Sequence, residues 1–176
     1  VVTGGGGILC SGFSKVLAQC GAKVAVLDLR GENASAVADE INKNGGTAIG
    51  ISANVLGKDS LMSAKAEVNE KFGKVDILIN GGNNPKGTTS KDYYEIGDED
   101  KEDIKSFFDL DPSGIEFVFN LNFLGTLLPT QVFAPDLIKT KGSIINISSM
   151  NAFAPLTRIP AYSGAKAAVS NFTQWL

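Results

Sequence analysis

Residues 1–28 read VVTGGGGILCSGFSKVLAQCGAKVAVLD, and this stretch decides the fold. It begins with a short β-branched run, Val1–Thr3, and ends with a second one, Lys23–Asp28. Runs of this kind predict buried strands. Between them lie a run of glycines, Gly4–Gly7, and a segment long enough for a helix. Because a helix between two strands makes a crossover connection, we expect the two strands to be parallel.

The segment between the strands is predicted to be a helix over Ser11–Cys20, ended by Gly21. Its apolar side chains recur at i, i+3, i+4 and i+7, which is one face of a helix. They are Phe13, Val16, Leu17 and Cys20. We expect that face to pack on the sheet, and both cysteines, Cys10 and Cys20, to be packing residues rather than redox centres.

Strands and helices continue to alternate along the rest of the chain. Further strands are predicted at Thr47–Ser52, Val75–Ile79 and Gly142–Ser148, and further helices at 32–44, Lys58–Phe72, 111–137 and Pro160–Leu176. Asp111 followed by Pro112 predicts a helix start, and Pro129 a kink in that helix. This alternation predicts an α/β fold: a Rossmann-type, doubly wound parallel sheet in three layers, α/β/α, within a single domain over residues 1–176.

The composition narrows the class of protein. The 176 residues are 43% hydrophobic and 20% charged with a net charge of −3, which favours a soluble domain over one that binds nucleic acid or an anionic membrane. No apolar run approaches the ~18 residues of a membrane-spanning helix, so we expect a cytoplasmic protein. The chain has no histidine and only two cysteines, which excludes Ser-His-Asp and Cys-His catalysis and argues against a protein-bound metal.

One segment, residues 86–116, interrupts the alternation. It contains ten acidic residues and four lysines, for a net charge of −6. We interpret it as an acidic insertion. It is either a solvated surface loop with a short helix, or a lid or oligomer contact beside the functional site.

The glycine run after the first predicted strand points to a nucleotide. Glycines let the backbone approach a pyrophosphate, and the N–H groups at the start of the following helix attract its negative charge. Asp28 ends the second strand, where a carboxylate can hold the 2′-hydroxyl of an adenosine ribose. The strict GxGxxG spacing is absent, so a tight glycine turn without a ligand stays open at this point.

The C-terminal helix carries the stronger signal, the segment YSGAK at Tyr162–Lys166. Tyr162 and Lys166 are four residues apart, so they lie on one helix face. A lysine cation favours the phenolate of a nearby tyrosine, which gives an acid/base group that works near neutral pH without histidine. Ser149, thirteen residues before Tyr162 and just after a predicted strand, can direct its hydroxyl toward the same substrate oxygen.

Together these features resemble the short-chain dehydrogenase/reductase family along the whole of residues 1–176. The matching segments, in the family's order, are Thr3-Gly4, Asp28, Asn54-Val55, Phe72–Asn80, Asn122–Gly125, Asn146–Ser149 and Tyr162 with Lys166. The resemblance implies an NAD(P)-dependent oxidoreductase that interconverts a ketone and a secondary alcohol. It assigns proton transfer to Tyr162 and the nicotinamide ribose to Lys166, which also tunes Tyr162. Ser149 would hold the reacting oxygen, and Asn122 would support a proton-relaying water.

The resemblance also implies which residues bind the cofactor. They are Thr3, Gly4, Gly5, Gly7, Ile8, Leu9, Asp28, Leu29, Asn54, Val55, Asn80, Gly81, Tyr162 and Lys166. Ile8 and Cys10 stand where the family has its second and third glycines, so side chains would crowd the pyrophosphate unless the backbone or Ser11 compensates. The charge of Asp28 favours NAD, while Arg30, two residues further on, leaves NADP open.

Within the family the chain resembles the D-mannonate oxidoreductase (fructuronate reductase) branch, through segments 3–10, 107–111, 122–131, 148–153 and 171–176. A sugar acid needs a cation for its carboxylate, and Arg158 is the first candidate because a guanidinium holds a carboxylate bidentately. Lys86 is the second candidate, and Asn151 is a candidate for the substrate hydroxyls. Each of the three is also compatible with an ordinary surface or capping role.

Other interpretations stay open. A gluconate 5-dehydrogenase, a 3-oxoacyl thioester reductase or a noncatalytic nucleotide-sensing protein would share much of the pattern. The resemblance implies a homotetramer or homodimer that takes a small-molecule substrate and no nucleic acid. It also leads us to expect that the family's last strands lie beyond Leu176 and that residues 81–84 mark a gap in the family's usual sequence.

Overall fold

The structure, a computed structural model, describes residues 1–81 and 106–176. The described residues form two compact units. Residues 1–81 and 124–147 make up the first unit, and residues 106–123 and 148–176 make up the second. The prediction that residues 1–176 are a single domain stays a prediction.

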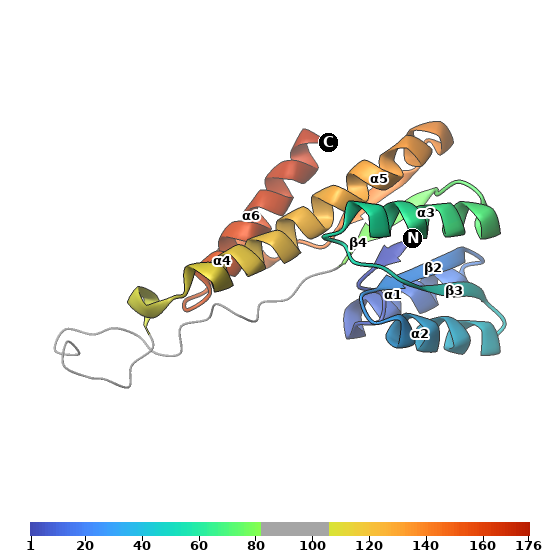
Figure 1. The fold of residues 1–176 in the computed structure, drawn as a ribbon, viewed down its shortest axis with the longest axis horizontal. Helices are drawn as coiled ribbons and strands as arrows, with labels where there is room; N and C mark the ends of the chain where they lie inside the picture. Colours follow the sequence, from blue (N-terminus) through green and yellow to red (C-terminus); the bar gives the residue numbers. More distant parts are fainter. Residues whose placement is uncertain (82–105) are drawn as a thin grey trace. The chain divides into compact units, whose positions relative to one another are not determined.

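Within the described part of the first unit, five parallel strands form one sheet in the order β3-β2-β1-β4-β5 (Figure 1). The strands are β1 (Val2–Thr3), β2 (Lys23–Asp28), β3 (Thr47–Ser52), β4 (Ile77–Asn80) and β5 (Ser143–Asn146). The register pairs Thr3 with Leu27 and Asp28 with Ser52, so β1, β2 and β3 end along one edge. This confirms the predicted parallel α/β sheet.

Helices cover both faces of this sheet. They are α1 (Ile8–Gln19), α2 (Gly31–Lys43), α3 (Lys58–Phe72) and α5 (Gly125–Thr140). Because side chains alternate along a strand, Val24 and Val26 of β2 pack with α1 and α2, while Ala25 and Leu27 pack with α3 and α5. The unit is therefore a three-layer α/β/α structure, as predicted.

Helix α1 packs on the core with part of the predicted face, Phe13 and Leu17, but its fully buried residues are others. Its buried residues are Cys10, Ser14 and Ala18, while Val16 is 58% exposed. Small side chains on this face let the helix lie close to the sheet, and the Ser14 hydroxyl is satisfied by the Cys10 carbonyl at 3.0 Å. Cys20 is exposed, so the expectation that it is a packing residue is wrong, whereas Cys10 is buried as expected.

The second unit contains η1 (Phe107–Asp109), α4 (Pro112–Phe119), η3 (Met150–Ala152) and α6 (Pro160–Trp175), and both α4 and η3 pack against α6. The Asp111 carboxylate accepts the Ser113 N–H at 3.2 Å, and Pro112 takes the first helical position, which confirms the predicted helix start. Of the predicted acidic insertion, the structure describes only residues 106–116.

A π-helical turn, η2 (Asn120–Leu124), follows α4 and precedes α5. The Asn122 Nδ2 donates a hydrogen bond to the Val118 carbonyl at 2.8 Å. This side-chain bond competes with the regular backbone bonds of the helix, which explains the wider turn. The sequence predicted a kink at Pro129, and Pro129 lies inside α5. The helical geometry changes before it, at the π-helical turn of η2.

One helical run among the described residues, Pro112–Thr140, is long and apolar enough to cross a membrane by length and composition alone. The expectation that no segment reaches this length is therefore wrong. In its α5 portion, however, Val132, Phe133 and Leu137 are buried in the core of the first unit. A core helix of a soluble protein passes the same test.

Candidate active site

The glycine turn and Asp28 form one structure at the carboxyl edge of the sheet. Gly4 has a φ of 61°, in the left-handed region that glycine adopts without strain, and its carbonyl accepts the Gly7 N–H at 3.0 Å. The Asp28 carboxylate accepts the N–H of Gly6 at 3.1 Å through Oδ2 and the N–H of Arg30 at 3.0 Å through Oδ1. The turn after β1 and the acid that ends β2 are thus hydrogen-bonded to each other.

Gly6 is absent from the predicted cofactor residues, although its position is the most constrained in the turn. A Cβ on Gly6 would lie 2.6 Å from the Asn33 Cβ and 2.9 Å from the Asp28 Oδ2. A Cβ on Gly5 would lie 2.6 Å from the Val26 Cγ1. The unbroken run of four glycines was the available signal, and the structure shows that its middle members have no room for side chains.

The residues that follow the turn face in different directions. Ile8 is 98% exposed and Leu9 is 56% exposed, whereas Cys10 is 4% exposed. The Cys10 Sγ lies 3.7 Å from the Gly81 carbonyl oxygen, just after β4. The Ser11 hydroxyl donates to the Ile8 carbonyl at 3.0 Å, within the helix itself. Cys10 is therefore directed into the unit, while Ile8 and Leu9 stay on its surface.

The other predicted cofactor residues of the first unit gather at the same edge. The buried Thr3 accepts the Gly81 N–H at 3.1 Å through its hydroxyl. Beyond β3, the Ala53 N–H donates to the Asp28 carbonyl at 2.8 Å, which fixes the start of the loop that carries the exposed Asn54. Leu29 is exposed and Val55 is half-buried.

The side-chain Nδ2 of Asn80 forms hydrogen bonds within the first unit. It is 2% exposed, and its Nδ2 donates to the Thr130 hydroxyl at 2.9 Å and to the Asn146 Oδ1 at 2.8 Å. Thr130 donates in turn to the Thr126 carbonyl at 2.8 Å. These bonds join the end of β4 to β5 and α5.

The second unit contains the residues predicted for catalysis. Tyr162 and Lys166 lie one turn apart on α6, and the Lys166 Nζ is 5.7 Å from the centroid of the Tyr162 ring. Lys166 is 1% exposed, although lysine is rarely buried this deeply. A cation at this distance from a ring centroid is attracted by the electrons of the ring.

The two serines before η3 have different partners. The Ser148 hydroxyl bonds to α6, at 3.2 Å from the Lys166 carbonyl and 2.6 Å from the Ser170 hydroxyl. The Ser149 hydroxyl accepts the Asn151 N–H at 3.2 Å, as the cap of η3. Ser148 thus joins the chain to α6, whereas Ser149 caps η3, and the choice of Ser149 stays a prediction.

Three further predicted residues of the second unit differ in environment. Asn122 is fully buried in η2, and Asn151 is 5% exposed in η3. Arg158 is exposed and has a φ of 70°, a left-handed conformation that is uncommon outside glycine. Lys86, the second cation proposed for a substrate carboxylate, lies outside the described residues, as does most of the segment 81–84.

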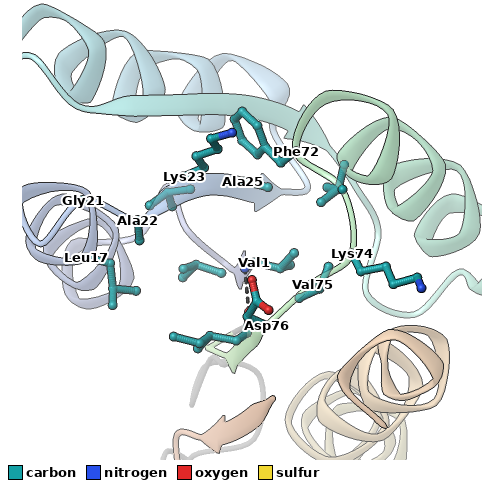
Figure 2. A pocket seen from close by; sticks show the side chains of 15 residues that line it. Val1, Leu17, Gly21, Ala22, Lys23, Ala25, Phe72, Lys74, Val75 and Asp76 are labelled. Carbon is teal, nitrogen blue, oxygen red and sulfur yellow. Dashed lines mark hydrogen bonds between the residues drawn. The ribbon is translucent and has the colours of Figure 1, made fainter. Parts of the chain in front are cut away.

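A cavity of about 390 Å³, whose lining residues Figure 2 shows, lies at the amino end of β2, and Asp28 is at the carboxyl end of that strand. Residues at the amino ends of β2 and β4 line the cavity. Lys23, Lys74 and Asp76 contribute its charged groups. None of the predicted site residues lines it, and ligands of doubly wound sheets bind at the carboxyl ends of the strands.

Comparison with known proteins identifies similar sequences and structures. The family model described as short chain dehydrogenase matches residues 1–176. An "Uncharacterized oxidoreductase" of Haemophilus influenzae is 56% identical over all of the chain, and an "Uncharacterized oxidoreductase UxuB" of Bacillus subtilis is 46% identical over all of it. The chain spans 62% and 63% of these two relatives.

A solved structure is similarly close. A candidate D-mannonate oxidoreductase from Haemophilus influenza, crystallised with bound NAD, superposes with a TM-score of 0.91 at 56% identity. The match covers 99% of this chain and 62% of that one.

Proposed function

The chain belongs to the short-chain dehydrogenase family, and on that premise we propose that it is part of an NAD-dependent oxidoreductase that interconverts D-fructuronate and D-mannonate, or a closely related pair of sugar acids. The observation that carries the proposal is the buried Lys166 cation beside the Tyr162 ring, 5.7 Å from its centroid. Burial of a charge is unfavourable unless it serves an interaction, and the proposal gives this charge the role of assisting the Tyr162 hydroxyl.

The first unit supports a dinucleotide cofactor. Gly5 and Gly6 bring backbone, without side chains, to the start of α1, and Asp28 offers a carboxylate beside that turn at the position expected for a ribose hydroxyl. The Asp28 charge disfavours a 2′-phosphate, so we propose NAD rather than NADP. The relative crystallised with NAD supports the same choice.

Lys166 would hold the nicotinamide ribose, and the bound cofactor would supply hydride transfer to or from the substrate carbon. In reduction, the Tyr162 hydroxyl gives its proton to the substrate oxygen, so that the ketone becomes a secondary alcohol. The Lys166 cation stabilises the phenolate that remains, and the Ser149 hydroxyl holds the substrate oxygen. In oxidation, the Tyr162 phenolate takes the proton back from the alcohol. Asn122 is proposed to support the water that exchanges this proton with solvent.

The sugar-acid part of the proposal depends on Arg158, Asn151 and the resemblance of the chain to its 56% identical structural relative. The exposed Arg158 guanidinium would pair with the substrate carboxylate, with Lys86 as the alternative cation. Asn151, buried next to Ser149, would bind a substrate hydroxyl. A 3-oxoacyl thioester would use neither group.

The last part of the proposal concerns the oligomeric state of the protein and its location in the cell. We propose a homotetramer or homodimer in the cytoplasm, with α6 at a contact between copies. Trp175, 78% exposed, stacks on Phe172 with ring centroids 6.1 Å apart and presents an apolar surface. Light scattering of the intact protein and of a Trp175→Glu variant tests this, and unchanged mass in the variant would contradict a contact at Trp175.

The experiment that tests the function uses the intact protein and a panel of two cofactors and two substrates. Oxidation of NADH and of NADPH is followed by absorbance, with D-fructuronate or a 3-oxoacyl thioester as the acceptor. We expect rapid NADH oxidation with D-fructuronate alone. Oxidation only with the thioester would overturn the substrate, and oxidation only with NADPH would overturn the cofactor. If neither cofactor is oxidised in any of the four mixtures and NADH still binds, the result would favour a nucleotide-sensing protein.

A further inference from the structure

Cys10 and Gly81 are 71 positions apart in sequence and in direct contact in the structure. The Cys10 thiol donates to the Gly81 carbonyl across 3.7 Å. An ideal Cβ on Gly81 would lie only 2.1 Å from the Cys10 Sγ, but 3.6 Å from the Cys10 Cβ. A side chain at residue 81 thus collides with the sulfur atom of Cys10, and alanine at position 10 would remove that collision.

The same contact fixes the backbone at the end of β4. The Gly81 N–H donates to the Thr3 hydroxyl at 3.1 Å, and its carbonyl accepts from the Cys10 thiol. Both polar groups of Gly81 are therefore held, one by the end of β1 and the other by the first turn of α1. In dinucleotide-binding sheets a glycine at the position of Cys10 allows close helix–strand packing.

We propose that Cys10 and Gly81 are a coupled pair that replaces this glycine, with Cys10 as a positioning residue for the cofactor edge of the sheet. Cys10 is 4% exposed and is directed into the unit, so it acts through Gly81 rather than on the cofactor itself. This inference rests on the proposed function, because it assigns the purpose of the pair to NAD binding.

The test is a double-mutant cycle in the intact protein, with Gly81→Ala, Cys10→Ala and both together. The dissociation constant for NADH is measured by fluorescence, and the melting temperature is measured on the same samples. We expect Gly81→Ala to weaken NADH binding about tenfold next to Cys10 and about threefold or less next to alanine at position 10. Some loss remains in the double variant, because the new Cβ would still lie 2.9 Å from the Thr3 carbonyl oxygen.

A second readout separates positioning from simple packing. We expect Cys10→Ala to raise the KM for NADH about threefold with kcat unchanged, and Cys10→Ser, which keeps a donor, to restore part of the loss. Cys20→Ala is the matched control, because Cys20 is exposed at the end of the same helix, and its KM should equal that of the wild type.

Equal effects of Gly81→Ala in the two backgrounds, on both NADH binding and melting temperature, would overturn the coupling. A fall in kcat for Cys10→Ala with KM unchanged would overturn the positioning role. If Gly81→Ala alone does not fold, recovery of folding in the double variant supports the coupling, and failure of both contradicts it. Absence of NADH binding by the wild type would contradict the proposed function and the cofactor role, while the melting temperatures would still report the coupling.

Discussion

The Asp28 carboxylate accepts a hydrogen bond from the Gly6 N–H at 3.1 Å, so the acid at the end of β2 is held against the glycine turn that follows β1. The two residues are 22 positions apart, and the parallel pairing of β1 with β2 brings them together. This one bond links the residue expected to select the ribose with the residues expected to face the pyrophosphate. Changes at either position should therefore affect cofactor binding.

Asp28→Asn tests the choice between NAD and NADP. Asparagine removes the charge that would repel a 2′-phosphate, and its single amide oxygen can keep one of the two bonds, from the Gly6 or the Arg30 N–H. We expect the ratio of kcat/KM for NADPH to that for NADH to rise by about tenfold or more. Asp39→Asn, an exposed change on α2, is the control. An unchanged ratio in Asp28→Asn would remove Asp28 from cofactor selection.

Gly6→Ala tests the close packing of the turn. Its Cβ would meet Asn33 at 2.6 Å and the Asp28 carboxylate at 2.9 Å, so we expect a loss of about 1–3 kcal/mol in the free energy of unfolding and weaker NADH binding. Gly12→Ala is the matched control, because no atom lies within 4 Å of its Cβ and alanine favours the helix. Urea unfolding should show Gly12→Ala to be as stable as the wild type or more stable by up to ~1 kcal/mol.

Asp136→Asn tests a buried ion pair between α3 and α5. The Lys65 Nζ lies 3.1 Å from the Asp136 Oδ1 and also donates to the Val132 carbonyl at 2.9 Å. Burial alone would raise the pKa of Asp136, but hydrogen bonds from Lys65 and Asn69 and the Lys65 charge outweigh it, so the pKa lies below its ordinary value of 3.8. Removal of the carboxylate leaves the partly buried Lys65 without its counter-charge, so we expect a loss of about 1–3 kcal/mol at pH 7.

The same pair sets a pH dependence of stability. Because the pKa of Asp136 is lower in the folded than in the unfolded chain, its contribution is present above the unfolded pKa of 3.8 and is lost as the pH falls through the folded pKa. Urea unfolding from pH 7 to pH 2 should show a smaller acid-induced loss in Asp136→Asn than in the wild type. Glu40→Gln removes the exposed Lys15–Glu40 pair as a control and should change stability by less than ~1 kcal/mol.

Arg158 combines a left-handed backbone with the cation proposed for the substrate. Glycine adopts a φ of 70° without strain, so Arg158→Gly keeps the backbone conformation while it removes the guanidinium. We expect the KM for D-fructuronate to rise by about tenfold or more, with NADH binding unchanged. Arg158→Lys should recover part of this loss. An unchanged KM in Arg158→Gly would exclude Arg158 from substrate binding and shift attention to Lys86.

Local patterns allowed most of the fold to be predicted, together with the shared helix of Tyr162 and Lys166. The βαβ unit at residues 1–28 follows from short strand runs on either side of a helical period. The four-residue spacing of Tyr162 and Lys166 fixes their common face on α6, and the structure adds that Lys166 is buried. These inferences depend on residues that are close in sequence, where backbone geometry leaves few alternatives.

The errors arise where packing depends on distant residues. The buried face of α1 was assigned from its large apolar side chains, whereas small residues, Ser14 and Ala18, make the close contact with the sheet. The contact of Cys10 with Gly81 depends on the strand order, which places β4 next to β1. The π-helical turn at Asn122 depends on a side-chain bond that no apolar pattern encodes.

The most direct test of the central claim is the turnover of Tyr162→Phe. This change removes the hydroxyl proposed to transfer the proton and keeps the ring beside Lys166. NADH oxidation with D-fructuronate and NADH binding are measured on the same preparation of the intact protein. The account predicts a loss of turnover of about a hundredfold or more with the dissociation constant for NADH within about threefold of the wild type. Full turnover in Tyr162→Phe would contradict it.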